Sequence, residues 1–258
     1  MSLERFDLKA YYSSRQGWHV ALRLRRTVAD FWQSGQNTSN AVIGYGAPLL
    51  RADDQAPKLV FLPDSINWKT CYTSTLARSA IVDCRSLPLQ NVQLDRLLVV
   101  HALEFDSEPG AFLDECWRVL DGAGRILIMV PNRTGVWARS EKTPFGHGRP
   151  FTRRQLQQLL QAHGFEPKRA QTVLFMPPSQ SGIVLRFGPQ IERLGRVWSP
   201  AIGGVLVIEA EKQLYAPIAS KERAGRISRL GAGNLAPRPT GAMRHFTDCH
   251  KNSSSSFL

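Results

Sequence analysis

The chain has 258 residues, which is enough for one sizeable domain with appendages and a real hydrophobic core. Hydrophobic residues make up 43% of it, as in an ordinary soluble globular protein, and no apolar run approaches the roughly 20 residues that span a membrane. The start, Met1 to Lys9, is too charged for a secretory signal peptide. We therefore expect a cytoplasmic protein without a membrane span.

The formal net charge of +12 predicts an acidic partner, which could be nucleic acid, anionic lipid or an acidic protein surface. Residues 216–258 carry seven Lys or Arg against two acidic residues, are rich in Gly, Pro and Ser, and lack apolar periodicity. This pattern predicts a basic, disordered tail that could bind nucleic acid. Nonspecific solvation explains the same composition equally well.

The four cysteines form no CxxC pair and the six histidines form no HExxH motif. His245, Cys249 and His250 are close in sequence, but they lie in the polar tail without a fourth ligand. We predict no metal site and expect reduced, structural thiols.

Residues 16–31 have apolar side chains at helical spacing, with Arg23, Arg25 and Arg26 on the other side. We expect an N-terminal helical cap, residues 1–36, over the sheet or over a ligand cleft. The arginines could meet phosphates, but a solvated helix face is the favoured interpretation.

Residues 40–44 form an apolar run that leads into Gly44-Tyr45-Gly46. Glycines at this point allow a sharp turn off a strand and close approach of a ligand to the backbone, although a plain tight turn explains them as well. The next strand is expected at 58–62. Asp64 lies 20 positions after Gly44, where nucleotide-binding folds carry a ribose-binding carboxylate, but it also suits a turn.

Two further strands are expected at 79–83 and 94–100. In doubly wound sheets ligands bind beyond the carboxyl ends of the strands, where the strand order reverses. His101 and Glu104 would lie there and are candidate catalytic residues. A histidine hydrogen-bonded by neighbouring backbone is the alternative interpretation for His101.

Residues 112–130 predict a helix, a glycine turn at 121–124 and a strand from Ile126 to Val130 that is apolar on both faces. Such a strand belongs in the middle of a sheet covered by helices on each side. The fold class is therefore α/β, with a doubly wound, mostly parallel, Rossmann-like sheet.

The loop at 132–152 is long, and its aromatic residues would not be left in water without cause. We expect Trp137, His147 and Arg149 to contact a substrate or partner, with His147 a further catalytic candidate; alternatively the loop only holds the sheet edge. Thr152 and Gln155 form a capping-box pattern before the next helix. The last elements are expected as strands at 172–176 and 204–210, with a helix at 190–197 between them. We expect Met176, Trp198 and Tyr215 either to form an apolar surface for a partner or to pack in the core or at the sheet edge.

The stretch 112–128 resembles the helix, turn and strand of class I S-adenosylmethionine-dependent methyltransferases, "E-x-x-R-V-L-K-P-G-G-R-L-L-I". The resemblance extends over about residues 37 to 212. Gly44-Tyr45-Gly46 matches the G-x-G of "V-L-D-L-G-C-G-x-G", and the stretch 83–89 resembles "D-A-x-x-L-P-F". It implies seven strands in the predicted domain 37–215, with S-adenosylmethionine as cofactor.

By this resemblance Asp83 would bind the adenine amino group beside the Cys84 backbone, and His101 would lie at the cofactor. Three positions depart from the pattern: Val42 replaces an acidic residue, Pro48 a glycine and Phe105 a histidine.

Three functions remain open. The first is a methyltransferase with an unidentified acceptor, since methyl transfer needs mainly positioning of the two reactants. The second is a catalytically inactive descendant that binds or regulates another protein, as the three departures suggest. The third is an RNA-binding or RNA-modifying protein, as the basic charge suggests.

Overall fold

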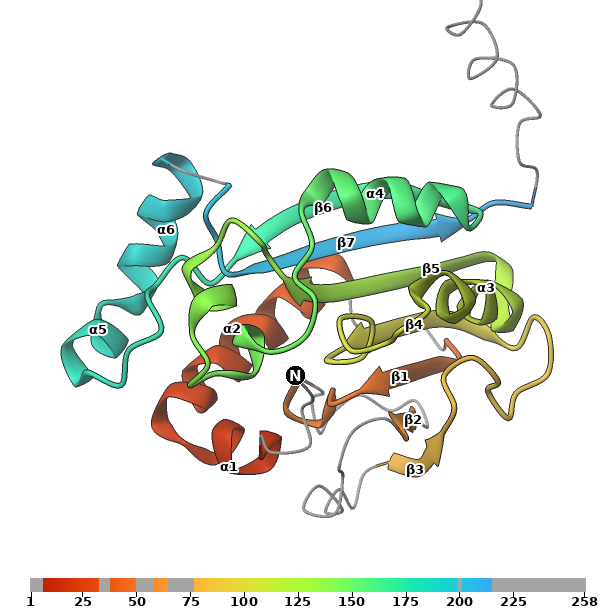
Figure 1. Ribbon diagram of the computed structural model, residues 1–258, viewed down its shortest axis with the longest axis horizontal. Helices are drawn as coiled ribbons and strands as arrows, with labels where there is room; N and C mark the ends of the chain where they lie inside the picture. The colour runs from red at the N-terminus through yellow and green to blue at the C-terminus, as the bar shows by residue number, and fades with distance from the viewer. Residues whose placement is uncertain (1–6, 33–37, 50–57, 65–76, 199–200, 215–258) are drawn as a thin grey trace, which may run out of the picture. The chain divides into compact units, whose positions relative to one another are not determined.

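A computed structural model describes residues 7–32, 38–49, 58–64, 77–198 and 201–214, all within one unit, Met1–Ala216 (Figure 1). Its centre is a seven-stranded sheet in the order β3-β2-β1-β4-β5-β7-β6. The strands are β1 Asn40–Gly44, β2 Lys58–Pro63, β3 Ala77–Val82, β4 Leu94–Val100, β5 Leu120–Pro131, β6 Phe165–Val173 and β7 Val205–Lys212. The first five run parallel, and β7 runs antiparallel to both β5 and β6. The predicted mostly parallel α/β sheet is confirmed.

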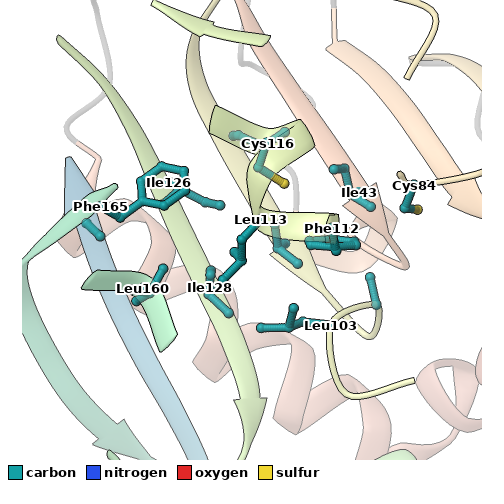
Figure 2. Close-up of a cluster of buried hydrophobic side chains, with 14 of the residues drawn as sticks. Ile43, Cys84, Leu103, Phe112, Leu113, Cys116, Ile126, Ile128, Leu160 and Phe165 are labelled. Atoms are coloured by element: carbon teal, nitrogen blue, oxygen red, sulfur yellow. The ribbon is translucent and has the colours of Figure 1, made fainter. Parts of the chain in front are cut away.

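Helices cover both faces of this sheet (Figure 1). On one face, α1 (Leu8–Ser13) and α2 (Arg15–Phe31) bury apolar residues with Leu127 and Met129 of β5. On the other face, α3 (Pro109–Val119) and α4 (Arg153–Ala162) pack with Ile126 and Ile128, as Figure 2 shows. Alternate residues of β5 thus enter two separate cores, which explains why the strand has to be apolar on both faces.

The remaining elements are short. The described residues include the short 3₁₀ turns η2 Ala47–Leu49, η3 Val136–Arg139 and η4 Pro144–Gly146. Helices α5 (Gly182–Arg186) and α6 (Gly188–Trp198) lie in the connection between β6 and β7. Within the described ranges, no helix is long and apolar enough to cross a bilayer.

The local sequence patterns placed most elements correctly. The predicted helices at 16–31 and 190–197 correspond to α2 and α6, and the capping box before α4 is present. In it the Thr152 hydroxyl accepts from Gln155 N at 3.2 Å, while the Gln155 side chain accepts from Thr152 N at 3.1 Å.

Two predicted boundaries were wrong. The glycine turn at 121–124 is part of β5, because Leu120 already pairs with Leu94 of β4 and only an irregularity in register follows. The strand expected at 172–176 is β6, which begins at Phe165 and ends at Val173. This strand lies at the sheet edge and is half exposed, so it carries few apolar residues; its pairing with β7 defines it.

Candidate functional site

The predicted cofactor residues follow the carboxyl ends of four adjacent parallel strands. Across the sheet their order is Asp83 after β3, Asp64 after β2, Gly44 at the end of β1, and His101 after β4. Neighbouring strands lie about 4.8 Å apart, so this row of four positions spans about 14 Å. The strand order reverses between β1 and β4, as expected from the doubly wound pattern. We call this row of positions the carboxyl edge.

Gly44 is required by the close contact of β1 with β4. Its φ is +94°, and a Cβ placed there would lie 1.9 Å from the carbonyl oxygen of Val100. The same oxygen accepts a hydrogen bond from Tyr45 N at 3.0 Å. The turn then closes through Leu49 N, which donates to Gly46 O at 2.9 Å. Tight packing against β4 therefore requires glycine at position 44. Because Gly44 has no side chain, the backbone at this turn is not covered by side-chain atoms of its own.

Asp83 presents a half-exposed carboxylate at the carboxyl edge. Its Oδ1 accepts hydrogen bonds from Arg85 N at 2.9 Å and Arg85 Nε at 3.1 Å, and these bonds lower the pKa of Asp83. Among the described residues no donor is bonded to Oδ2. The carboxylate is therefore ionised at neutral pH and keeps one acceptor oxygen for a ligand.

The neighbours of Asp83 differ in what they can offer a ligand. Asp64 is exposed, and its backbone N donates to Val82 O at 3.1 Å, which ties the ends of β2 and β3 together. Cys84 turns its thiol into the core beside Phe112, and burial raises the pKa of that thiol to about 12 (Figure 2). Only the backbone of Cys84 is suited to ligand contact.

His101 lies at the end of β4 in a buried side-chain chain with Tyr12 and Glu104. The Tyr12 hydroxyl is 2.8 Å from His101 Nε2, and His101 Nδ1 is 3.3 Å from Glu104 Oε1. His101 and Glu104 are each 2% exposed. The partners of the imidazole are thus side chains, and the neighbouring backbone that the alternative interpretation favoured does not bind it.

The electrostatics of this chain favour one arrangement of protons. Burial, followed by the nearby Tyr11, Tyr45 and Glu104, raises the pKa of Tyr12 well above its usual value. Tyr12 therefore keeps its proton and can donate a hydrogen bond to His101 Nε2. The ring N–H of His101 is then at Nδ1, which faces Glu104. The Nδ1–Oε1 contact lacks hydrogen-bond geometry, and among the described residues neither atom has another hydrogen-bond partner. The backbone of His101 is also left-handed, with φ of +51°.

Rings from distant parts of the chain surround His101. The aromatic cluster is a row of five rings in the order Tyr45, Tyr12, His101, Phe145 and Trp137. The centroids of neighbouring rings in this row lie 5.0 to 5.9 Å apart. No sequence pattern pointed to Tyr12, since the stretch around it shows neither a motif nor apolar periodicity. Only packing brings α1 to the end of β4.

The long loop after β5 returns to this cluster. Gly148 contacts Glu104 and Phe105 so closely that a Cβ there would lie 2.6 Å from the Phe105 ring, and Arg149 N donates to Glu104 O at 2.7 Å. The Arg149 side chain is exposed, and His147 donates through Nε2 to Glu141 O at 2.9 Å. The loop backbone at Gly148 and Arg149 therefore lies against Glu104 and Phe105.

Trp137 has a different role from the one expected. Its side chain is fully buried, and its Nε1 donates to Met176 O at 2.7 Å. A buried ring offers no surface to a substrate, so for Trp137 the alternative interpretation, in which the loop is anchored to the sheet, agrees with the structure. Met176 is likewise buried, whereas Trp198 is exposed and Tyr215 lies outside the described residues.

Two departures from the family pattern also have structural consequences. Val42, which replaces an acidic residue, is 2% exposed and packs in the core shared with α1 and α2. Phe105 is partly buried against the same core. In the described part of the chain no group of His, Cys, Asp or Glu is arranged to hold a metal ion, and His245, Cys249 and His250 lie outside it.

Known proteins share this topology. No family model matches the chain. A probable S-adenosylmethionine-dependent methyltransferase of Mycolicibacterium smegmatis is 30% identical over 130 residues, 48% of either chain, so the similarity spans about half the length of that relative. A SAM-dependent methyltransferase structure from Thermotoga maritima superposes with a TM-score of 0.59 at 18% identity, covering 82% of this chain and 98% of that one.

Two further solved structures superpose on the chain with similar TM-scores. A SAM-dependent methyltransferase from Archaeoglobus fulgidus gives a TM-score of 0.57 at 17% identity, covering 79% of this chain and 97% of that one. The chain has the class I methyltransferase fold. A putative methyltransferase of Haloferax volcanii, solved in complex with the Trm112 methyltransferase activator, gives 0.55 at 10% identity, covering 81% and 99%.

Proposed function

We propose that the chain is an S-adenosylmethionine-dependent methyltransferase whose cofactor binds along the carboxyl edge. One observation carries the proposal: two exposed carboxylates, a glycine turn and a histidine follow four adjacent parallel strands on either side of the β1/β4 reversal. The 30% identity to a methyltransferase over about half of the chain supports the same activity.

The residues at the carboxyl edge fit the parts of this cofactor. Carboxylates accept hydrogen bonds from ribose hydroxyls and from an adenine amino group, so Asp64 and the Oδ2 of Asp83 would hold the nucleoside, with the backbone of Cys84 beside it. The backbone at Gly44, Tyr45 and Gly46 would meet the amino-acid end, next to His101. Because Val42 is buried in the core, the acidic contact that the family makes there would be missing.

The cofactor would supply an electrophilic methyl group on a positively charged sulfur. His101 and Glu104, each 2% exposed, would support the site from within the core, and the half-buried His147 would be the candidate base for a proton that the acceptor loses. His147 and Arg149 would contact the acceptor from the loop above.

A partner protein and the basic tail belong to this proposal as well. The Haloferax methyltransferase of the same fold was solved with an activator protein, which supports a protein partner for this chain. Nucleic-acid binding through residues 216–258 and a cytoplasmic location remain predictions. If the tail binds RNA, affinity should fall steeply with salt and disappear when the chain is truncated after Tyr215.

Calorimetric titration with S-adenosylmethionine and S-adenosylhomocysteine tests the proposed cofactor. We expect micromolar binding that Asp83→Asn and Asp64→Asn each weaken at least about tenfold, the loss of one charge-assisted hydrogen bond. Asp121→Asn is the matched control, since Asp121 is an exposed carboxylate at the opposite, amino end of β5. Absence of binding at millimolar ligand would refute the enzyme and favour a noncatalytic binding subunit.

A further inference from the structure

The two helices between β6 and β7 expose an unusual amount of apolar surface. Five large side chains of α5, α6 and the residue between them, Phe187, are between 50% and 83% exposed: Ile183, Phe187, Leu194, Val197 and Trp198. In Figure 1 these helices lie beside α2, away from α3 and α4. We call these five residues the apolar face. Single exposed apolar residues are common, but a group of five on two consecutive helices indicates a docking surface.

The exposed charged residues of α5 and α6 are all positive. Arg186, Arg193 and Arg196 are exposed on the same two helices. Glu192 is the one acidic residue of these two helices. It is 1% exposed and accepts a hydrogen bond from Phe175 N at 2.9 Å, so its carboxylate lies in the protein interior and not on the surface. The exposed surface of α5 and α6 therefore combines large apolar groups with arginines and carries no acidic group.

Neighbouring helix α2 adds to this positive charge. Burial is the main cause of the lowered pKa of Arg23; the buried carboxylate of Glu192 opposes this shift, while Arg26, Arg196 and Arg193 add to it. At α5, a Cβ on Gly182 would lie 3.3 Å from Nη1 of Arg15. Basic groups of α2 therefore lie near α5 and α6 as well.

We propose that the α5–α6 face is a peripheral docking surface for an anionic phospholipid bilayer. Amphipathic helices bind in the plane of a membrane interface when Trp, Phe and aliphatic residues enter the acyl boundary and Arg or Lys meet the headgroups. Both halves of that requirement are present here. The inference concerns a surface and does not depend on the proposed methyl transfer.

Charge and chemistry distinguish this occupant from two others. A second copy of the chain, paired symmetrically through the same patch, would bring arginines against arginines without an exposed acid on these helices to neutralise them. Nucleic acid would satisfy the arginines, but Ile183, Leu194 and Val197 have no π-face on which a base could stack. An anionic bilayer uses the whole face.

Vesicle flotation with the full chain tests the proposal. We expect binding to mixed phosphatidylcholine and phosphatidylglycerol vesicles, weaker binding to phosphatidylcholine alone, and loss of the difference at high salt. Val197→Ser/Trp198→Ser should reduce binding to anionic vesicles at least about tenfold, and Arg193→Gln/Arg196→Gln should remove most of the preference for phosphatidylglycerol.

Matched variants separate this surface from the rest of the chain. Ile81→Ser replaces an exposed apolar residue on β3, the opposite edge strand, and Arg153→Gln/Arg154→Gln removes two exposed arginines on α4; both should bind like the unaltered chain. Circular dichroism checks that all variants are folded.

Three outcomes would overturn the proposal. The first is unchanged vesicle binding by the α6 variants, which would assign it to another part of the chain. The second is a dimer, seen by light scattering, that Val197→Ser/Trp198→Ser abolishes while vesicle binding is absent. The third is retention of an RNA oligonucleotide that depends on these residues when vesicles are not bound.

Discussion

Replacing Tyr12 with Phe tests the buried chain that joins α1 to the end of β4. The substitution removes the hydroxyl that lies 2.8 Å from His101 Nε2 and leaves the ring in its packing against Tyr45. Nε2 is then buried without a hydrogen-bond partner, which costs about 1–3 kcal/mol of unfolding free energy. With a urea m-value of about 2 kcal/mol per M, the unfolding midpoint should fall by roughly 0.5–1.5 M.

A double-mutant cycle with His101→Asn isolates this contact. Asn tolerates the left-handed backbone that position 101 adopts, so the second substitution adds little strain. We expect a coupling energy of about 1 kcal/mol or more between the two sites. Additive effects, with coupling below about 0.3 kcal/mol, would show that the hydroxyl and the imidazole do not interact in solution.

The pH dependence gives a second measurement of the same group. Burial raises the folded-state pKa of Tyr12 well above its usual value of 10.0, so its contribution to stability is complete below pH 10 and is lost as the pH rises further. Stability of the unaltered chain should therefore fall more steeply above pH 10 than that of Tyr12→Phe. Parallel curves would contradict the assigned burial.

Three more predictions concern the packing beneath the site. Gly44→Ala should lower the free energy of unfolding by about 3 kcal/mol or more, because its Cβ would lie 1.9 Å from Val100 O and φ is +94°. The control Gly122→Ala meets only the flexible Leu214 side chain and should cost less than about 1 kcal/mol. Equal thermal midpoints for the two variants would contradict this. Burial raises the pKa of Glu192, so this carboxyl group destabilises the folded chain as the pH rises above 4.5. Glu192→Gln should remove that loss of stability and keep the acceptor for Phe175 N. Glu192→Ala should lower the free energy of unfolding in urea by about 1–3 kcal/mol, because Phe175 N loses its acceptor. Cys84 and Cys116 are buried with raised pKa values, so both thiols should resist alkylation at pH 8 until the chain unfolds; rapid modification of the native protein, seen by mass spectrometry, would contradict their placement.

The sequence alone determined the architecture and the row of positions along the carboxyl edge. Apolar periodicity, glycine turns and a capping box are local patterns, and they placed β1, β4, β5 and α4 because each depends on residues near one another in the chain. The rule that ligands bind beyond the carboxyl ends of parallel strands pointed to His101, the spacing of 20 residues from Gly44 pointed to Asp64, and the resemblance to class I methyltransferases pointed to Asp83.

Tertiary packing decided what surrounds His101 and which side chains reach solvent. The Tyr12–His101 contact joins residues 89 positions apart, and no local pattern encodes such a contact. Packing likewise made Trp137 a core residue and left Trp198 exposed, although each tryptophan follows a valine in the sequence. Side-chain environment depends on which elements pack against each other, and that is fixed only when the whole sheet and its helices assemble.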